Sequence, residues 1–348
     1  MKTNHIFQRN LAALALLSSF SLHPSVVLGQ GSLTPPGAPG VTMKSLDQIE
    51  PRKPIYYAGF GAWQPGSYYL TTNLTCASGQ SGISVTANNV TIDLNGFSLT
   101  GSGSGSYGVS FGSTVTNFTL RNGTVNGFYY GIGDGSAGGS ANVVLDGVTI
   151  TGSGSAGVWS YRALTVRNCL FFSNSTAIFL PNGGQIIDCT VNSSSGSGIY
   201  VAGGEVRHCR VTNNGGIGID VAPGVVSDCW VQNNALSGIC VDASVQGGGS
   251  EIIRNICNNN NTSDNGQHAG IRINVSGCRV EDNHVSFCWV AGIAVTNTLS
   301  GNIIVKNSVW DTISGVNYLT GSATQFIGPI ITTQGTITNT SPWANFSY

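Results

Sequence analysis

Hydrophobic positions recur along this chain in short steps, each made of a glycine followed by an aliphatic, a variable and an aliphatic residue. The best-preserved steps read AIFL, GIYV, GIDV, GICV and GIRI, between Ala177 and Ile273. Alternation with a period of two is typical of a short β-strand. The steps are 20 to 32 residues apart, which indicates one solenoid turn per step. Ala177 replaces the glycine once, and the glycines are Gly82, Gly108, Gly131, Gly157, Gly198, Gly218, Gly238, Gly270, Gly292 and Gly315.

The repeat that begins at Gly218 shows how three strands fit into one turn. We predict strands at 219–221, 225–227 and 230–232, separated by turns rich in Pro, Gly, Asp and Asn. Three short strands per turn predict an all-β fold, a single-stranded right-handed parallel β-helix of about 11 rungs. At about 4.8 Å per rung, the ten intervals in the repeat predict a rod about 48 Å long.

Equivalent residues of successive turns should form columns along the solenoid. One predicted inward column is Val166, Ile186, Val206, Val226, Ile252, Val280 and Ile304, and a second is Phe171, Val191, Val211, Val231, Cys257, Val285 and Val309. The polar column between them is Asn122, Asp146, Asn168, Asp188, His208, Asp228, Arg254, Asp282 and Lys306. Asn, Asp and His tolerate the left-handed conformation of a sharp corner, which accounts for most of this column. The alternative is a hydrogen-bonded, metal-binding trio of Asp188, His208 and Asp228.

Four of the nine cysteines, Cys169, Cys189, Cys209 and Cys229, are 20 residues apart. They should therefore stack at the same place in successive turns, about 4.8 Å apart. Side chains that point in parallel would strain a disulfide. We predict a ladder of small buried side chains, with disulfides or soft-metal binding as the alternatives.

Composition and the N-terminus limit the classes of function. Only 8% of residues are charged and the net charge is -1, so no basic stripe indicates a nucleic-acid partner. Lys2 and Arg9 precede the apolar run 11–22, and small residues end at Gly29. This pattern predicts a signal peptide rather than a membrane span, because the run is too short to cross a bilayer. We expect a protein that is secreted or resides in the cell envelope, either extracellular or periplasmic, and a monomer.

The predicted organisation follows from where the repeat begins and ends. The segments are a signal peptide (1–29), a linker and N-terminal cap (30–56), the β-helix (57–320) and a C-terminal cap or tail (321–348). A short helix over 43–51 would close the N-terminal end of the core. For the C-terminal segment, packing over the last rung and an export or docking signal are the two alternatives.

The rung pattern, together with QPGSYYLTTNLT (64–75) and NNVTIDLNGFSLTG (88–101), resembles the pectate-lyase-like right-handed parallel β-helix superfamily. The closest resemblance is to secreted bacterial β-helix repeat proteins of unassigned activity. The resemblance implies that the outer face of the first sheet forms a saccharide cleft, as in many members. It also implies that the Asp228-Cys229 corner is where an internal asparagine ladder often runs.

The outward residues of the first strands are the main candidates for binding. In rung order they are Ser84, Ser110, Gly133, Trp159, Phe179, Tyr200, Asp220, Cys240, Arg272 and Ala294. Trp159, Phe179 and Tyr200 should offer flat apolar ring faces to sugar rings. The alternatives are that the aromatic rings only stack on one another, or that a loop covers them.

The widest interval, from Gly238 to Gly270, carries two longer loops that should rise on either side of this track. One loop brings Asp242, and the other brings Asp264 and His268. We therefore predict Asp220, Asp242, His268 and Arg272 as a catalytic group and Asp264 as a binding residue. Tolerated surface insertions are the alternative.

Two reactions fit this group. A lyase acting on uronic-acid polymers would use Arg272 or His268 as base, and Asp220 and Asp242 would hold Ca²⁺ if the reaction needs it. No other cofactor is expected. A hydrolase would use Asp220 and Asp242 as paired carboxylates. The chain has no Asp-Asp, Gly-His-Gly or Arg-x-Pro-x-x-Arg sequence, so familiar pectin-degrading signatures are missing. The sequence predicts polysaccharide binding, leaves cleavage open, and has a non-catalytic structural or cell-surface rod as its alternative.

Overall fold

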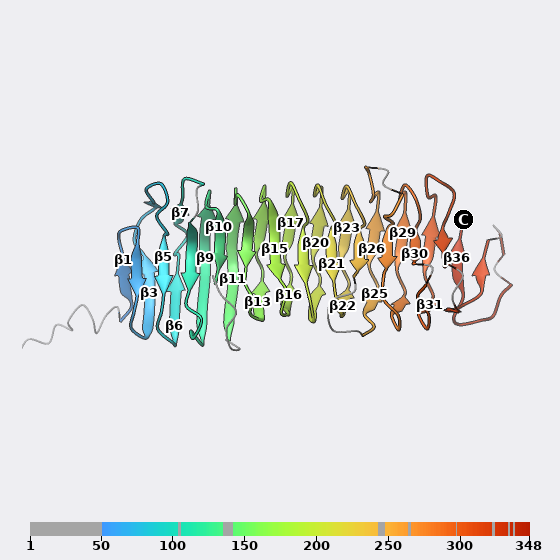
Figure 1. The fold of residues 1–348 in the computed structure, drawn as a ribbon, viewed down its shortest axis with the longest axis horizontal. Coiled ribbons are helices and arrows are strands. Elements are labelled where there is room, and N and C mark those ends of the chain that lie inside the picture. The colour runs from blue at the N-terminus through green and yellow to red at the C-terminus, as the bar shows by residue number, and fades with distance from the viewer. Residues whose placement is uncertain are drawn as a thin grey trace, which may run out of the picture. The chain divides into compact units, whose positions relative to one another are not determined.

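The computed structural model describes residues 51–348 except 104–105, 135–141, 243–247, 264–265, 297, 322–323, 333–334 and 337. The described residues form a parallel β-solenoid of about 11 turns and contain no helix (Figure 1). None of their segments could therefore cross a membrane as an apolar helix. The predicted signal peptide, the linker and nearly all of the predicted N-terminal helix lie outside the described residues. The expected all-β right-handed β-helix is confirmed.

The glycine-led steps form one sheet of 12 parallel strands. In spatial order its strands are β2 (Phe60–Ala62), β5 (Ile83–Val85), β8 (Tyr107–Phe111), β10 (Tyr130–Gly133), β12 (Ala156–Trp159), β15 (Thr176–Leu180), β18 (Ile199–Val201), β21 (Ile219–Val221), β24 (Ile239–Val241), β27 (Ile271–Ile273), β30 (Ile293–Val295) and β33 (Tyr318–Leu319).

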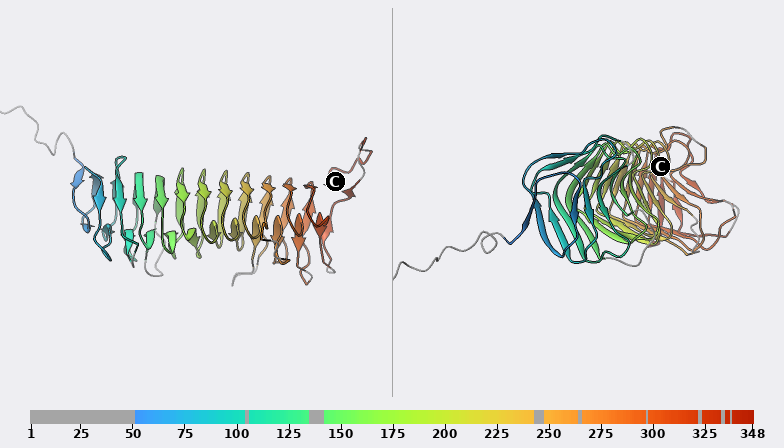
Figure 2. Two further views of the ribbon diagram at one scale, coloured as in Figure 1. Left: turned by 90° about the horizontal axis from the view of Figure 1, so that it is seen from above. Right: turned by 60° about the vertical axis from the view of Figure 1, so that its left-hand side comes forward.

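The other 24 strands form the remaining faces of each turn (Figure 2). The strands that follow the first sheet, together with the leading strand β1, are β1 (Lys53–Ile55), β3 (Gly66–Leu70), β6 (Val90–Asp93), β9 (Phe118–Asn126), β11 (Val143–Thr151), β13 (Leu164–Arg167), β16 (Gly184–Ile187), β19 (Gly204–Arg207), β22 (Gly224–Ser227), β25 (Glu251–Ile253), β28 (Arg279–Glu281), β31 (Ile303–Val305) and β34 (Phe326–Ile327). The third face holds β4 (Leu74–Thr75), β7 (Ser98–Thr100), β14 (Leu170–Phe172), β17 (Thr190–Asn192), β20 (Arg210–Thr212), β23 (Trp230–Gln232), β26 (Ile256–Asn258), β29 (His284–Ser286), β32 (Ser308–Trp310), β35 (Ile330–Ile331) and β36 (Asn345–Ser347). β9 and β11 are long enough to run through the corner between both faces.

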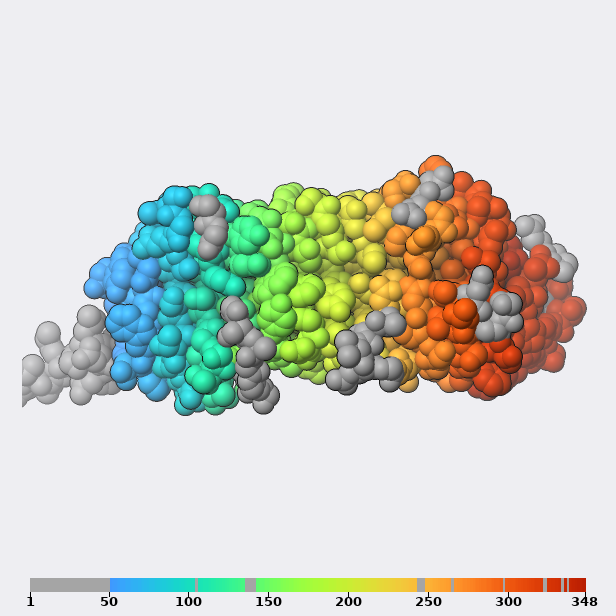
Figure 3. All heavy atoms as spheres, viewed as in Figure 1, coloured from blue at the N-terminus to red at the C-terminus, as the bar shows by residue number. Residues whose placement is uncertain are grey.

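Both predicted inward columns are confirmed. Val166 pairs in register with Ile186 and Phe171 with Val191, and each column continues strand by strand to Ile304 and Val309. Every member is fully buried, so the core is a continuous stack of mostly aliphatic side chains. In the space-filling view successive turns lie directly against one another along the solenoid (Figure 3).

The polar corner column is confirmed as a column of left-handed residues, with one exception. Its members have φ between 52° and 60°, including Arg254 and Lys306, which are unusual in that conformation. At Asp146 the left-handed residue is instead Gly147, with φ 64°. The corner therefore requires the conformation more strictly than it requires any residue type.

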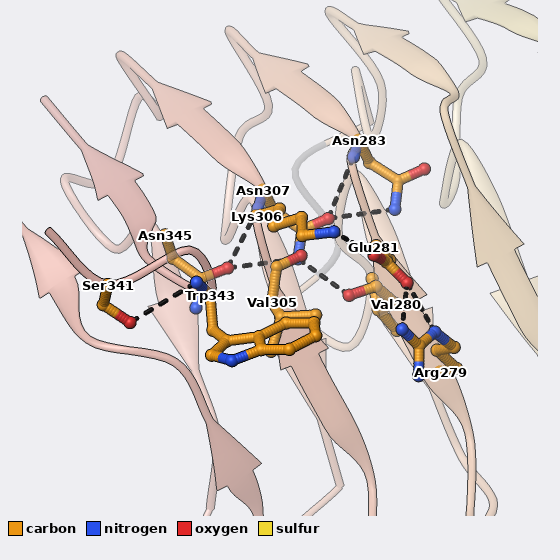
Figure 4. A network of polar contacts seen from close by, with 10 residues as sticks. All are labelled: Arg279, Val280, Glu281, Asn283, Val305, Lys306, Asn307, Ser341, Trp343 and Asn345. Carbon is orange, nitrogen blue, oxygen red and sulfur yellow. Dashed lines mark hydrogen bonds and ion pairs between the residues drawn. The ribbon is translucent and has the colours of Figure 1, made fainter.

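The residue after each corner forms a buried ladder that changes chemistry along the solenoid. All nine cysteines are buried free thiols, and the Cys169, Cys189, Cys209 and Cys229 thiols donate to carbonyl oxygens two residues earlier at 3.1 to 3.2 Å. The same ladder continues as Asn255, Asn283, Asn307 and Asn345, whose side chains bond to one another at 3.0 to 3.2 Å. Figure 4 shows the last three of these asparagines. The expected thiol ladder is confirmed, and the asparagine ladder that the resemblance implied occupies its C-terminal continuation.

Strand pairing runs from Lys53 to Ser347, so residues on both sides of the predicted range 57–320 take part. β36 pairs with β32, and Asn345 ends the asparagine ladder. Trp343 lies beside Lys306, whose ammonium is 5.0 Å from the indole centre (Figure 4). An open apolar depression lies between this segment, β31 and β34. The last described residues thus lie over the final turns of the solenoid.

Candidate functional site

The outward residues of the 12-stranded sheet form one unbroken column, which we call the central column. Strand pairing places each member opposite the next in register. Its members are Gly61, Ser84, Ser110, Gly133, Trp159, Phe179, Tyr200, Asp220, Cys240, Arg272, Ala294 and Leu319. The register predicted from sequence is therefore correct over the whole predicted column.

Five aromatic rings form a continuous stack on this sheet, which we call the aromatic ladder. Trp159 and Phe179 lie 4.4 Å apart between ring centres at 19°, and Phe179 and Tyr200 lie 4.9 Å apart at 17°. Tyr107 and Tyr130 stack at 4.9 Å, and Tyr130 meets Trp159 at 5.4 Å with a tilt of 51°. The predicted track of three rings is thus extended by two tyrosines from earlier turns.

The stacking decides which part of each ring a ligand can reach. Nearly parallel rings at 4.4 to 4.9 Å cover one another's faces, and all five residues are only partly exposed. The expectation that Trp159 and Phe179 offer open flat faces is therefore wrong, because their neighbours occupy those faces. What remains at the surface is a ridge of ring edges, and ring edges carry the positive end of the aromatic quadrupole.

Beyond Tyr200 the central column becomes polar, and Asn274 organises the neighbouring side chains. Its Nδ2 donates to Asp242 Oδ1 at 2.5 Å and approaches Cys240 Sγ at 3.6 Å. Its Oδ1 accepts from Arg272 Nε at 2.9 Å and from Thr296 Oγ1 at 2.6 Å. One amide thus fixes a carboxylate, a guanidinium and a hydroxyl. We call Asp220, Asp242, Arg272, Asn274 and Thr296 the polar cluster.

Asp220 is the least satisfied member of the polar cluster. Its Oδ1 is inaccessible to solvent and has no hydrogen-bond partner among the described residues. Burial, and secondarily the nearby charge of Asp242, raise the pKa of Asp220 to about 7. Burial, together with the charges of Asp220 and Asp242, also raises the pKa of Tyr200, the last ring of the ladder.

The four predicted catalytic residues come together only in part. Asp220, Asp242 and Arg272 belong to the polar cluster. His268 Nδ1 shares a hydrogen bond with Ser237 Oγ at 3.0 Å. Burial and the nearby Arg272 lower the pKa of His268, against a smaller opposing effect of Asp242. Asp264 lies outside the described residues.

The polar cluster does not form a good calcium site. One donor atom each from Asp220, Cys240 and Asp242 lies within 4.8 Å of the others. Ca²⁺ takes six to eight oxygen ligands, whereas one of these three donors is a buried thiol. Asn274 Oδ1 is already engaged by two donors. The described side chains therefore fit Ca²⁺ poorly.

The corner trio proposed as an alternative site is divided between different partners. His208 Nδ1 lies 3.4 Å from Asp188 Oδ1, and more than half of each side chain is exposed. Asp228 instead receives two hydrogen bonds from Arg254, each at 2.8 Å. Both are surface contacts of the kind found on many proteins.

Sequence reasoning missed Asn274, Thr296 and the two additional tyrosines. Asn274 and Thr296 lie two residues after Arg272 and Ala294, the same offset that separates Asp242 from Cys240. Reading that second position in every turn would have found them. Tyr107 and Tyr130 precede the glycines, so no outward column of the predicted strands contains them.

The comparisons with known proteins agree with this architecture. A family model described as a right handed beta helix region matches residues 59–205. The chain is similar to PfbA, a surface adhesin of Streptococcus pneumoniae, with 12% identity and a TM-score of 0.51 over 78% of this chain and 83% of that one. No curated protein matches the chain.

Two further solved structures are similar at slightly lower scores. The Dettilon tailspike protein is 13% identical, with a TM-score of 0.49 over 85% of this chain. The chain covers 61% of that tailspike, less than two thirds of its length. The A-module of mannuronan C-5 epimerase AlgE4 from Azotobacter vinelandii is 14% identical, with a TM-score of 0.47 over 82% of this chain and 91% of that one.

Identities this low define the fold and not the reaction. The matching family model, the strand register and the three strands per turn agree on the architecture. The chain folds as a right-handed parallel β-helix.

Proposed function

We propose that this protein binds a polysaccharide along the outer face of the 12-stranded sheet. The observation that carries the proposal is the unbroken central column, in which the aromatic ladder leads directly into the polar cluster. A polymer laid along the solenoid axis would meet the apolar ring edges and then the fixed polar groups in sequence. Such a combination of apolar surface with a few fixed polar groups is typical of ligand sites.

The ring edges suit a ligand rich in hydroxyl groups. Edges of aromatic rings are positive and attract oxygen lone pairs, while the ladder tyrosines add hydroxyl groups that donate and accept. The ladder carries no charge of its own. Arg272 is the one cation in the described central column, so the site favours a neutral or weakly acidic glycan over a densely anionic one. We further propose that binding takes place outside the cytoplasm.

A retention assay tests the proposal. Purified protein would be run through native gels containing mannuronan, polygalacturonate, α-1,3-glucan or xylan. We expect retardation on at least one of them, and loss of retardation in a Trp159→Ala, Tyr200→Ala double variant with unchanged circular dichroism. A matched control is Trp230→Ala, an exposed tryptophan on the third face. Equal retention of wild type and double variant would contradict the proposal, and absence of retention on every glycan would favour a structural rod.

Cleavage is a second candidate, favoured by one observation. Asp220 holds a buried oxygen with no hydrogen-bond partner in the part of the chain that the structure describes, and it lies beside Asp242, which Asn274 fixes in place. A carboxyl group with a raised pKa next to a fixed carboxylate is the arrangement of a general acid and its partner. Products of a bound glycan would be read as reducing ends and as absorbance at 235 nm. We expect Asp220→Asn to abolish product formation while retention persists, and wild-type rates in this variant would place any reaction elsewhere.

A further inference from the structure

Trp63 occupies the N-terminal end of the central column in an unusual way. It follows β2 and is 71% exposed. A β-carbon added to Gly61 would lie 2.3 Å from two atoms of the Trp63 indole. The indole therefore lies against the backbone of Gly61, in space that is free only because this residue is glycine. Since Gly61 pairs with Ser84 in register, Trp63 lies at the start of the proposed binding track.

The exposure of Trp63 distinguishes it from every ring of the aromatic ladder. All five ladder rings are only partly exposed, and the inner rings Tyr130, Trp159 and Phe179 have a neighbouring ring on each side. Trp63 is 71% exposed, and its indole lies against Gly61. Trp63 thus keeps open a flat apolar face of the kind that the inner ladder rings lack. That face is the part of an aromatic ring on which the C–H face of a pyranose stacks.

The central column carries only small residues between Trp63 and the stacked ring of Trp159. After Gly61 the next members of the central column are Ser84 and Ser110, whose hydroxyl oxygens lie 3.2 Å apart. Each hydroxyl can donate one hydrogen bond and accept two, so capacity remains for ligand hydroxyl groups. Six strand steps separate Gly61 from Tyr200, which is about 29 Å at about 4.8 Å per step.

We propose that Trp63 is an outer sugar-binding subsite, at which a pyranose unit stacks on the open indole face. The subsite rests on the proposed function, because it places one end of the same polysaccharide. It assigns a direction and a length to the ligand, which runs along the solenoid axis from Trp63 to the polar cluster. Only chains long enough to span about 29 Å contact both Trp63 and Tyr200.

Length dependence tests this subsite. A glycan retained by the wild type would be partially hydrolysed and fractionated into oligosaccharides shorter and longer than about 29 Å. Dissociation constants would be measured by calorimetry for the wild type, Trp63→Ala and Trp63→Phe. Trp343→Ala is the matched control, because Trp343 is also exposed, at 49%, and lies outside the central column. Circular dichroism would verify that each variant is folded.

We expect Trp63→Ala to raise the dissociation constant of the long oligosaccharides about tenfold, since tryptophan is prominent among residues whose truncation costs binding energy. Trp63→Phe should lose less, and Trp343→Ala nothing. Short oligosaccharides that occupy the ladder should bind Trp63→Ala as they bind the wild type. If Trp63→Ala binds long chains normally while the Trp159→Ala, Tyr200→Ala variant does not, the subsite is refuted and the proposed function stands. If the wild type binds no glycan, both are refuted.

Discussion

Replacing Asp220 by asparagine should change how the stability of the protein depends on pH. Burial and the charge of Asp242 raise the pKa of Asp220 from 3.8 to about 7. The folded protein therefore holds this proton more tightly than the unfolded chain does. The stability that Asp220 contributes is fully present below about pH 4 and is lost as the pH rises through about 7. Above that pH the wild type is folded around a poorly solvated carboxylate.

The size of the effect follows from the shift. A difference of about three pKa units corresponds to about 4 kcal/mol between protonated and ionised forms. Asparagine has the shape of the protonated acid and does not titrate in this range. We expect the free energy of unfolding of Asp220→Asn to lie within about 1 kcal/mol of the wild-type value near pH 4. Near pH 8 it should exceed the wild-type value by about 3 to 4 kcal/mol. For roughly 300 folded residues this is about 6 °C in Tm.

Thermal and denaturant unfolding at both pH values would measure the difference between variant and wild type. Ser84→Ala is a suitable control, because it changes the same column without removing a titrating group. An Asp220→Asn variant whose stability difference is the same near pH 4 and near pH 8 would refute the reasoning. The conclusion would then be that water or a donor reaches Asp220 Oδ1.

Three further predictions concern the interior. Arg162 is fully buried, pairs with Asp134 at 2.9 Å and donates to the Val115 and Gly112 carbonyls at 3.0 and 2.9 Å. Arg162→Met should lower the free energy of unfolding by about 3 to 5 kcal/mol, measured by denaturant unfolding. A decrease below about 1 kcal/mol would contradict a paired buried charge. Asn283→Ala removes a side chain that is hydrogen-bonded to the turns on both sides, so we expect the free energy of unfolding to fall by about 2 to 4 kcal/mol. Asn283→Cys should cost less, because earlier turns have cysteine at this position. Equal losses for the two variants would contradict the equivalence of the ladders. All nine cysteines are buried, and burial raises the pKa of Cys257 well above its usual value. A thiol reagent should therefore label almost none of them in the native protein and all nine after unfolding. Rapid labelling of the native protein would show that the core opens.

The columns could be predicted from sequence because the repeat itself fixes them. A strand places alternate residues on opposite faces, and each turn adds one strand to each sheet. Once Gly218 and Gly238 are aligned, Asp220 must lie opposite Cys240. The left-handed corner at Asp228 follows in the same way, because its residue type and its place in the repeat agree.

The contacts within the site could not be predicted because they depend on side-chain direction. Tyr107 lies over Gly133, where an added β-carbon would come within 3.3 Å of its ring. Glycine at residue 133, in another turn, leaves room for the ring there. Arg162 follows a strand, where a charged residue usually reaches solvent, but three turns close around it. The positions of the Tyr107 ring and of the Arg162 guanidinium therefore cannot be predicted from residue type alone.

Strand spacing also explains why the binding surface has two kinds of aromatic group. Neighbouring strands lie about 4.8 Å apart, close to the 4.4 and 4.9 Å between the stacked rings. Consecutive aromatic residues in one column of a parallel sheet therefore cover each other's faces. A ring keeps a face open only where its neighbours are small, as Gly61 and Ser84 are beside Trp63. An exposed ring face on such a solenoid is thus expected at the end of an aromatic track and not in its middle.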